Sequence, residues 1–291
     1  MKISFGMIVL NGNYVLKEVL ESVYDFAHQI LIAEGPVKYW QEQGVNTSTD
    51  GTNEILDSFY DPDNKIKIVH SQYNEKTEQA NAYMWQLADD ADYVWNLDCD
   101  EIFKGDDLEK VFSLLGEHKY TSAGFKSRSF YGGFDRTIGG FEWDAEFIRV
   151  RKVYPGSYWS THRPPTIRHH EAMSPLPEKH LSSDELFVHG VQMYHYSYVF
   201  PEQVKQKLSY YKAAVSKENC IDNYFDEVYM PWVVGDYKTV EDKYDGVHEF
   251  KPNVRGSSRT IPFKDQHPNI ISRHMDVLKH KFREQLVKYV A

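Results

Sequence analysis

The pattern in this sequence with the clearest chemical meaning is Asp98-Cys99-Asp100-Glu101, which directly follows the apolar run 93–97. Alternation along the end of a strand would place Asp98 and Asp100 on the same side. Two carboxylates at such close range repel each other unless they share a cation. A hard ion such as Mg²⁺ or Mn²⁺ takes one or two carboxylates and completes its coordination with phosphate oxygens and water. The pattern therefore predicts a divalent ion together with a diphosphate ligand.

The elements that must position these acids are repeated βα units. Apolar runs alternate with stretches of helical periodicity through residues 1–100, which is typical of a mainly parallel sheet. We expect strands at 3–10, 29–33, 66–70 and 93–97. Because open α/β sheets bind ligands beyond the carboxyl ends of their strands, the residues at those ends are the first candidates for ligand contacts. They are Asn11, Glu34, Ser71 and Asp98.

Helices are expected between these strands, the first behind an Asn13 cap and the second behind a Thr52 cap. The connection 35–51 is much longer than usual, and loops of this kind are often functional. Residues 102–199 form an irregular pattern, with strands expected at 147–153 and 191–198. Pro201 should begin a helix, residues 219–270 look loop-rich, and a last helix covers 275–289.

The composition excludes several classes of protein. A formal charge of -10 argues against a broad nucleic-acid interface, which depends on Lys and Arg. Two cysteines without a C-x-x-C spacing make a disulfide framework or a cysteine metal site improbable. We see no apolar run long enough to span a membrane and no signal peptide, and we expect a cytoplasmic protein. The 15% aromatic content suits sugar-stacking surfaces and a tyrosine-rich core equally.

Two motifs in order carry a resemblance to a known family. The segment 48–52, Ser-Thr-Asp-Gly-Thr, followed by 97–101, Leu-Asp-Cys-Asp-Glu, resembles the family 2 glycosyltransferases, which have a GT-A fold. Their second strand commonly ends in an acid that contacts the nucleotide base, and Glu34 is similar to it, although about a dozen residues separate it from Ser48. A helix before the D-x-D strand often opens with Ala-Arg-Asn, where this chain has Gln79-Ala80-Asn81 and no arginine.

The resemblance implies a donor site for a UDP- or GDP-sugar, from which the sugar passes to an acceptor hydroxyl. The residues that it places near the donor are Asn11, Glu34, Asp50, Asn81 and Asp98. The alternative for Asp50 and Thr52 is a turn that caps the following helix, and for Glu34 a solvated loop position.

The segments 149–151, 170–171 and 194–198 resemble a subgroup of this family with R-x-F-R, H-E and H-x-x-Y elements. By that resemblance His195 is a third metal ligand beside Asp98 and Asp100. An imidazole ligand favours Mn²⁺ over Mg²⁺. We therefore expect a GT-A catalytic domain at 1–200, with a nucleotide-sugar half at 1–101 and an acceptor half at 102–200, and a C-terminal helical extension at 201–291.

An inverting transfer needs a carboxylate that removes the proton of the acceptor hydroxyl. The candidates are Glu171, Asp144 and Glu142, with Glu171 first and a salt bridge from Glu171 to Arg149 or Arg151 as its alternative. The sequence leaves the stereochemistry open. Lys205 and Lys207 are candidate cations for the departing diphosphate.

Three other functions stay open. A nucleotidyltransferase would carry a Gly-rich, Arg-containing loop after the first strand, and Asn11-Gly12-Asn13 matches it poorly. A non-catalytic sugar-nucleotide-binding module would keep the fold without turnover. A phage-type transferase acting on hydroxymethylated DNA bases would need a local positive track. Its candidate residues are Arg149, Arg151, Lys152, Arg163 and Arg168, although a saccharide acceptor is the main expectation.

Overall fold

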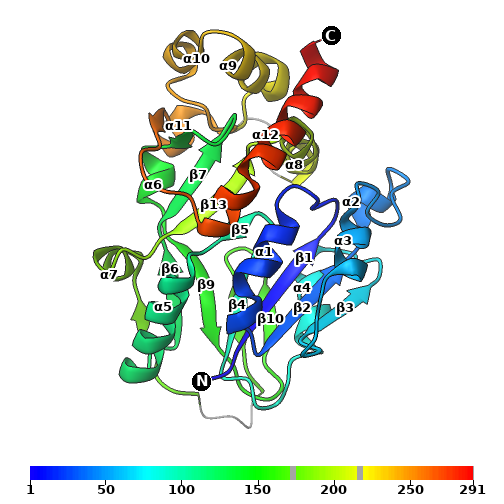
Figure 1. The fold of residues 1–291 in the computed structure, drawn as a ribbon, viewed down its shortest axis with the longest axis vertical. Coiled ribbons are helices and arrows are strands. Elements are labelled where there is room, and N and C mark those ends of the chain that lie inside the picture. The colour runs from blue at the N-terminus through cyan, green and yellow to red at the C-terminus, as the bar shows by residue number, and fades with distance from the viewer. Residues whose placement is uncertain (171–174, 215–218, 291) are drawn as a thin grey trace. The chain divides into compact units, whose positions relative to one another are not determined.

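The computed structural model describes residues 1–170, 175–214 and 219–290, and these form two compact units (Figure 1). The first unit comprises Met1–Phe125 and Glu146–Gln192, and the second comprises Lys126–Ala145 and Met193–Ala291. Each unit is assembled from two separate stretches of chain, whereas the sequence suggested one boundary at residue 200. None of the helices in these ranges is both long and apolar enough to cross a membrane.

The first unit is built on a seven-stranded sheet with the order β12-β6-β9-β4-β1-β2-β3. Strand β9 is antiparallel to both of its neighbours, and the other pairs are parallel. The mainly parallel sheet and its first four strands are confirmed, and β2 continues through Glu34. The strands are β1 (Ile3–Val9), β2 (Gln29–Glu34), β3 (Ile66–His70), β4 (Tyr93–Asn96), β6 (Ser122–Phe125), β9 (Phe147–Lys152) and β12 (His180–Leu181).

Helices cover both faces of this sheet, as expected for a doubly wound fold (Figure 1). Helices α1 (Leu16–Val23) and α3 (Thr52–Ser58) contact each other. The crossover from β3 to β4 runs in the opposite direction along the sheet, so the right-handed rule puts α4 (Lys76–Met84) on the other face. The remaining helices of the unit are η1 (Tyr24–Phe26), α2 (Lys38–Gln41), α5 (Gly105–His118) and α7 (Ser183–Val188).

The two expected helix caps are wrong. Helix α1 has Val15 at its N-cap, and no side chain caps it. Helix α3 follows Gly51, which has a φ of 94° and likewise provides no side chain. Asn13 Nδ2 instead donates to the carbonyl of Asp50, and Thr52 Oγ1 accepts from the amide of Gly12 at 2.8 Å. Both polar groups were expected to serve their own helix, but a partner from another loop competes for them.

Residues 102–199 are more regular than expected. Helix α5 buries Leu108, Val111 and Leu115, whose helical spacing is present in the sequence but was not predicted as a helix. The short strand β5 (Glu101–Ile102) precedes it, and β10 (Tyr158–Thr161) and β11 (Thr166–Arg168) form an antiparallel hairpin later in the unit.

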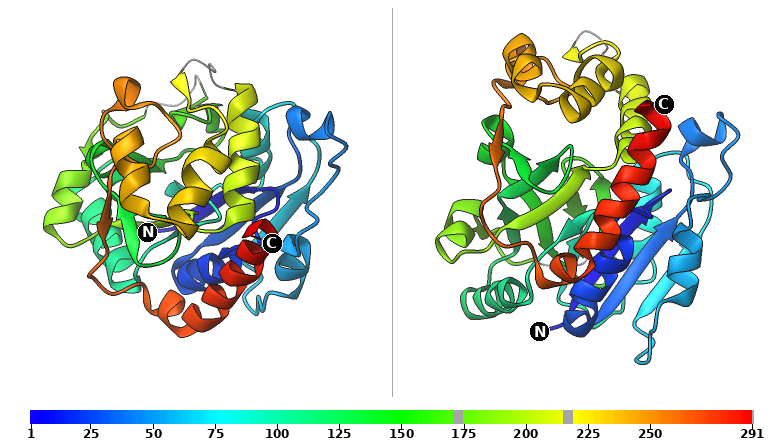
Figure 2. Two further views of the ribbon diagram at one scale, coloured as in Figure 1. Left: turned by 90° about the horizontal axis from the view of Figure 1, so that it is seen from above. Right: turned by 45° about the horizontal axis from the view of Figure 1, so that its top comes forward.

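The second unit contains strands in the order β14-β8-β7-β13 and a helical part (Figure 2). The helical part contains an aromatic core. The segment 219–270, expected to be loop-rich, holds four short helices. Helices α8 and α12 confirm the two that were expected. The elements are β7 (Ser127–Tyr131), β8 (Arg136–Ile138), α6 (Phe141–Asp144), β13 (Met193–Tyr198), α8 (Pro201–Ala214), η3 (Phe225–Tyr229), α9 (Met230–Val234), α10 (Tyr237–Tyr244), α11 (Pro252–Arg255), β14 (Thr260–Pro262) and α12 (Asn269–Val290).

Candidate functional site

The acidic motif lies in a tight turn beyond the carboxyl end of β4. The strand is buried throughout and ends at Asn96, and the amide of Glu101 donates to the carbonyl of Asp98 at 3.1 Å. Asp98 and Asp100 are partly exposed, and one carboxylate oxygen of each lies within 4.8 Å of the other. The two acids therefore converge as expected. They do so because the chain turns, rather than by alternation along a continuing strand.

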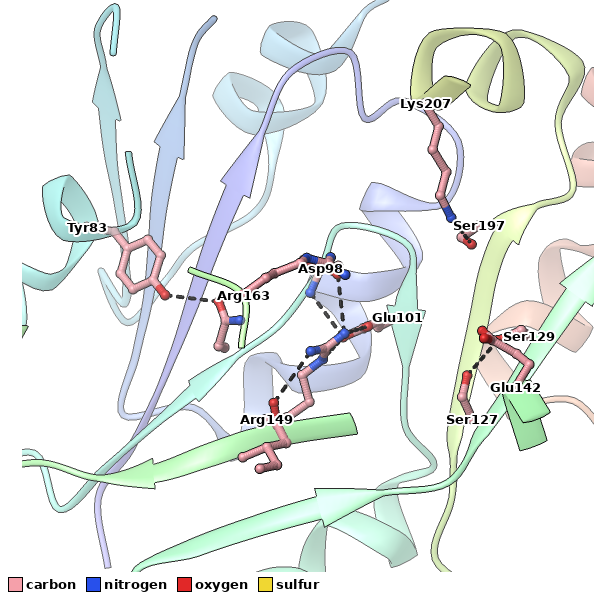
Figure 3. Close-up of polar contacts among 12 residues, drawn as sticks. Tyr83, Asp98, Glu101, Ser127, Ser129, Glu142, Arg149, Arg163, Ser197 and Lys207 are labelled. Atoms are coloured by element: carbon pink, nitrogen blue, oxygen red, sulfur yellow. Dashed lines mark hydrogen bonds and ion pairs between the residues drawn. The ribbon is translucent and has the colours of Figure 1, made fainter. Parts of the chain in front are cut away.

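A buried ion pair fixes this turn to the neighbouring strand. Glu101 is 0% exposed and Arg149, on β9, is 5% exposed. The Arg149 Nε donates to Glu101 Oε2 at 2.8 Å, and Nη2 contacts the other carboxylate oxygen (Figure 3). Burial alone would lower the pKa of Arg149, but the carboxylates of Glu101 and Asp98 raise it overall. The guanidinium is thus held charged beneath the acidic turn.

The role of Glu101 was not predicted from the sequence. Arg149 was instead an alternative partner for Glu171, which lies outside the described residues. Two features of the sequence could have indicated this pair: Glu101 is the third acid of the motif at 98–101, and Arg149 lies on a strand expected in the same sheet. A buried bidentate pair of this kind positions a loop rather than contacting a ligand.

Asp98 is also paired with two guanidinium groups in this state. Its Oδ2 accepts from Arg163 Nη2 at 2.9 Å and from Arg149 Nη2 at 3.3 Å (Figure 3). The side chain of Arg163 is 52% exposed, whereas that of Asp98 is 18% exposed. An ion at Asp98 would therefore compete with Arg163 for this oxygen.

The field around the turn is nevertheless negative enough to affect a neighbouring thiol. Desolvation, and then the carboxylates of Asp100, Asp98 and Asp50, raise the pKa of Cys99 well above its usual value. The Asp50 loop thus lies within electrostatic range of the turn, as the family resemblance implied. The same carboxylates would favour a bound cation.

Residues 48–52 are bonded to the loop that follows β1. The amide of Asn11 donates to Ser48 Oγ at 2.8 Å, and Asn11 Oδ1 accepts from the amide of Thr49 at 2.7 Å. Asp50 accepts from the amide of Asn13 at 2.9 Å and from Thr52 Oγ1 at 2.6 Å. Asn11 and Asp50 therefore order the two loops, and their expected contacts with a nucleotide stay a prediction.

Gly51 is required by this arrangement. Its φ of 94° lies in the left-handed region, and a Cβ added there would meet Asn13 Nδ2 at 2.7 Å. Asn13 Nδ2 in turn donates to the carbonyl of Asp50 at 2.7 Å. A larger residue would strain the backbone and push away the side chain that joins the loops.

Glu34 anchors the same loop from the end of β2. Its carboxylate is 1% exposed and accepts from the amide of Ser48 at 2.8 Å, and it lies 3.1 Å from Nδ1 of His70. The solvated-loop alternative for Glu34 is wrong because this residue is buried and bonded. Contact with the nucleotide base stays a prediction.

Asn81 joins α4 to the β10–β11 hairpin. Its Nδ2 donates to the carbonyl of Trp159 at 2.9 Å, and its Oδ1 accepts from the amide of Trp159 at 2.8 Å. The preceding Gln79 is buried and donates to the carbonyls of Ala33 and Gly35, each at 3.0 Å. This region thus holds α4, the end of β2 and the hairpin together, and a donor contact by Asn81 stays a prediction.

The remaining candidates belong to the second unit. His195 lies on β13 opposite Ser129 and is 8% exposed. Asp144 is exposed at the end of α6, whereas Glu142 is buried and accepts from Ser129 Oγ at 2.8 Å (Figure 3). Of the two described base candidates, only Asp144 is exposed to solvent.

The candidate cations of α8 have partners within the second unit. Lys207 Nζ donates to Ser197 Oγ at 3.0 Å (Figure 3) and lies 3.7 Å from the centre of the Tyr198 ring. Lys205 Nζ lies 5.0 Å from the centre of the Tyr289 ring. Both ammonium groups are therefore close to aromatic faces, which partly compensates their charge.

Comparisons with known proteins give one family match that includes these segments. Residues 45–168 match the family model described as glycosyl transferase family 2. A comparison with curated proteins gives no match. Among solved structures, TarS 1-349 of S. aureus is 20% identical, with 44% of this chain and 36% of that chain covered and a TM-score of 0.34. The same TarS fragment in complex with UDP-GlcNAc is 20% identical, with 46% and 36% covered and a TM-score of 0.34.

The chain spans about a third of the length of these TarS fragments. The family match, by contrast, includes both the Asp50 loop and the acidic turn after β4. Residues 45–168 are therefore similar to the family 2 glycosyltransferases, and the segments that carry this similarity are presented by a mainly parallel α/β sheet.

Proposed function

We propose that the chain transfers a sugar from a nucleotide-sugar donor to an acceptor hydroxyl, and that a divalent ion is needed. The observation that carries the proposal is the pair of carboxylates at Asp98 and Asp100, 4.8 Å or less apart, beyond the carboxyl end of a central strand. Ligands of open α/β sheets bind at this edge. The donor is a UDP- or GDP-sugar, and the acceptor is a saccharide.

The ligand set fits Mn²⁺ or Mg²⁺. Asp98 and Asp100 supply hard oxygen ligands, and the carboxylates that raise the Cys99 pKa create a field that favours a cation. His195 of the second unit is the proposed third ligand, on the resemblance of the 194–198 segment, and it would favour Mn²⁺. A bound ion would stabilise the charge that develops on the departing nucleoside diphosphate.

The protein's own residues would prepare this donor site. The Glu101–Arg149 pair holds the acidic turn, and Glu34 together with Asn11 and Asp50 holds the loop at 48–52. An ordered site of this kind need not rearrange when charge moves in the transition state. Asp144, exposed on α6, is the described candidate for the base that accepts the proton of the acceptor hydroxyl.

Charge pairing argues against DNA as the acceptor. Arg149 is buried with Glu101, Arg151 Nη1 lies 3.2 Å from Glu178 Oε1, and Arg163 is paired with Asp98. Three residues of the five-residue positive track are thus compensated by acids. Phosphate binding depends on cations that release counterions.

The first experiment is thermal stabilisation by UDP-, GDP-, CMP- and dTDP-sugars, with and without Mn²⁺. A ligand that binds only the folded chain raises its apparent stability, by about 2.7 kcal/mol at a hundred times its Kd. We expect one nucleotide class to raise the Tm only when Mn²⁺ is present. Asp100→Asn should lose this response and His195→Gln should weaken it.

The matched control is Asp89→Asn, which removes the same charge from an exposed position before β4. It should respond like the native chain. If no donor stabilises the native chain, or if Asp100→Asn responds as fully as Asp89→Asn, the metal-dependent transferase is contradicted and a binding module without turnover becomes the better account.

A further inference from the structure

The tip of the β10–β11 hairpin lies against the start of α4. Asn81 bonds both backbone groups of Trp159 on β10, and the amide of His162 donates to Thr77 Oγ1 at 3.2 Å. These contacts fix the backbone of His162 and Arg163 at the tip. The Arg163 side chain is directed to Asp98, with which it is paired at 2.9 Å.

His162 carries a buried nitrogen that the fold does not explain. The residue is 8% exposed, and within the described ranges its Nε2 has no hydrogen-bond partner. Burial, and then the positive charge of Arg163, lower its pKa to about 3, with Lys76 and Arg149 contributing and Asp98 opposing. Buried polar atoms of native proteins are normally bonded, so an orphaned one indicates a missing ligand or water.

The charges around this nitrogen indicate an anionic ligand. Three cations, Arg163, Lys76 and Arg149, act on His162 together with one carboxylate, Asp98. Arg149 is already bound to Glu101 through two nitrogens, whereas half of the Arg163 side chain is exposed. A planar guanidinium that reaches solvent beside a buried donor is suited to phosphate oxygens.

We propose that Arg163 is a diphosphate-binding residue that exchanges one anion for another. Without a divalent ion it neutralises Asp98, and when an ion takes the Asp98 carboxylate it turns to the phosphates of the donor, with His162 Nε2 as a second contact. The inference rests on the proposed function.

The exchange predicts opposite effects of one substitution on two ligands. Arg163→Gln removes the competitor for Asp98, so the affinity for Mn²⁺ alone should rise about two- to fivefold, the range of a partly exposed ion pair. In saturating Mn²⁺, its affinity for UDP, GDP or dTDP should fall about ten- to a hundredfold, the range of a charge-assisted hydrogen bond. Titration calorimetry measures both constants without turnover.

Three further variants sharpen the test. Arg168→Gln removes the same charge from an exposed position on β11 and should change neither constant by more than about twofold. Arg163→Lys keeps the charge but loses the planar fork, and its nucleotide affinity should fall between those of the native chain and Arg163→Gln. His162→Asn should weaken nucleotide binding and leave the affinity for Mn²⁺ alone unchanged.

If the native chain binds a nucleoside diphosphate with Mn²⁺ and Arg163→Gln behaves like Arg168→Gln, this inference is overturned while the proposed function stands. The same holds if Arg163→Gln weakens the binding of Mn²⁺ alone as much as that of the nucleotide. If the native chain binds none of the three nucleotides, both proposals fall.

Discussion

The two units of the chain use buried polar groups in different ways. In the first unit, charged side chains gather beyond the strand ends, where Glu101 and Arg149 hold the acidic turn and Glu34 holds the loop at 48–52. In the second unit, buried carboxylates accept hydrogen bonds from the side chains of the aromatic core. Glu241 accepts from Trp232 Nε1 at 2.9 Å, and Glu249 accepts from the hydroxyl of Tyr198. Polar networks order the loops beyond the strand ends in one unit and complete a core in the other.

Part of the aromatic content of the sequence lies in this core. The hydroxyl groups of its tyrosines bond to one another or to buried acceptors, as between Tyr131 and Tyr224 at 2.9 Å. Burial raises the pKa of Tyr198 and Tyr224 well above the usual value, which keeps both hydroxyl groups protonated and able to donate. The core belongs to the second unit and contains Tyr131, Tyr198, Tyr224, Phe225, Tyr229 and Trp232.

If this contrast is correct, breaking the polar network of the first unit should affect both stability and ligand binding. Arg149→Met leaves Glu101 charged and buried without its partner, so we expect a loss of about 3–5 kcal/mol in the free energy of unfolding. Urea titration measures that loss, and calorimetry of the surviving folded protein should find weaker Mn²⁺ binding.

Arg151→Met provides the comparison on the same strand, because its partner Glu178 is exposed. Arg151→Met should lower the free energy of unfolding by no more than about 1 kcal/mol. Equal losses for the two substitutions would mean that the Glu101 pair is not the anchor of the turn.

A second test concerns pH and the buried His162. Its folded-state pKa is about 3, well below the unfolded value of about 6.5, so only the unfolded chain takes up a proton between these limits. Its contribution is therefore fully present above pH 6.5 and is lost as the pH falls toward 3. Between pH 7 and 5 the native chain should lose about 2 kcal/mol more stability than His162→Asn. Urea titrations of both proteins at pH 7 and pH 5 measure this difference. If the native chain and His162→Asn lose the same free energy of unfolding between the two pH values, His162 is not held neutral.

The smallest expected effect lies in the second unit. Tyr229 donates to the carbonyl of Val199 at 2.6 Å, and Tyr229→Phe leaves that carbonyl without this donor, at a cost of about 1 kcal/mol. Mn²⁺ and nucleotide affinities of the folded variant should be unchanged. Tyr60→Phe, at a residue that is 82% exposed, should change neither property. A shift in ligand affinity for Tyr229→Phe would break the contrast between the units.

Some site residues could be predicted from the sequence because their signal is local. Asp98 and Asp100 follow an apolar run that is typical of a central strand. Asp50 lies in the segment 48–52, whose residues are all common in turns. The caps of α1 and α3 could not be predicted in this way. Asn13 and Thr52 are good capping residues, but in the fold Asn13 bonds to the carbonyl of Asp50 and Thr52 bonds to the amide of Gly12. A local preference of about 1 kcal/mol is easily outweighed by a partner from another loop.

The sequence alone determined the order of the βα units, the acidic motif and the Ser48–Thr52 segment, because periodicity and short motifs are properties of neighbouring residues. Only the tertiary structure decided the partners: Arg149 with Glu101, 48 residues apart, and Asn81 with Trp159, 78 residues apart. It also decided that the carboxylates meet in a turn. The physical reason is that a side chain's partner depends on which strand ends become neighbours, and that is set only when the whole sheet has assembled.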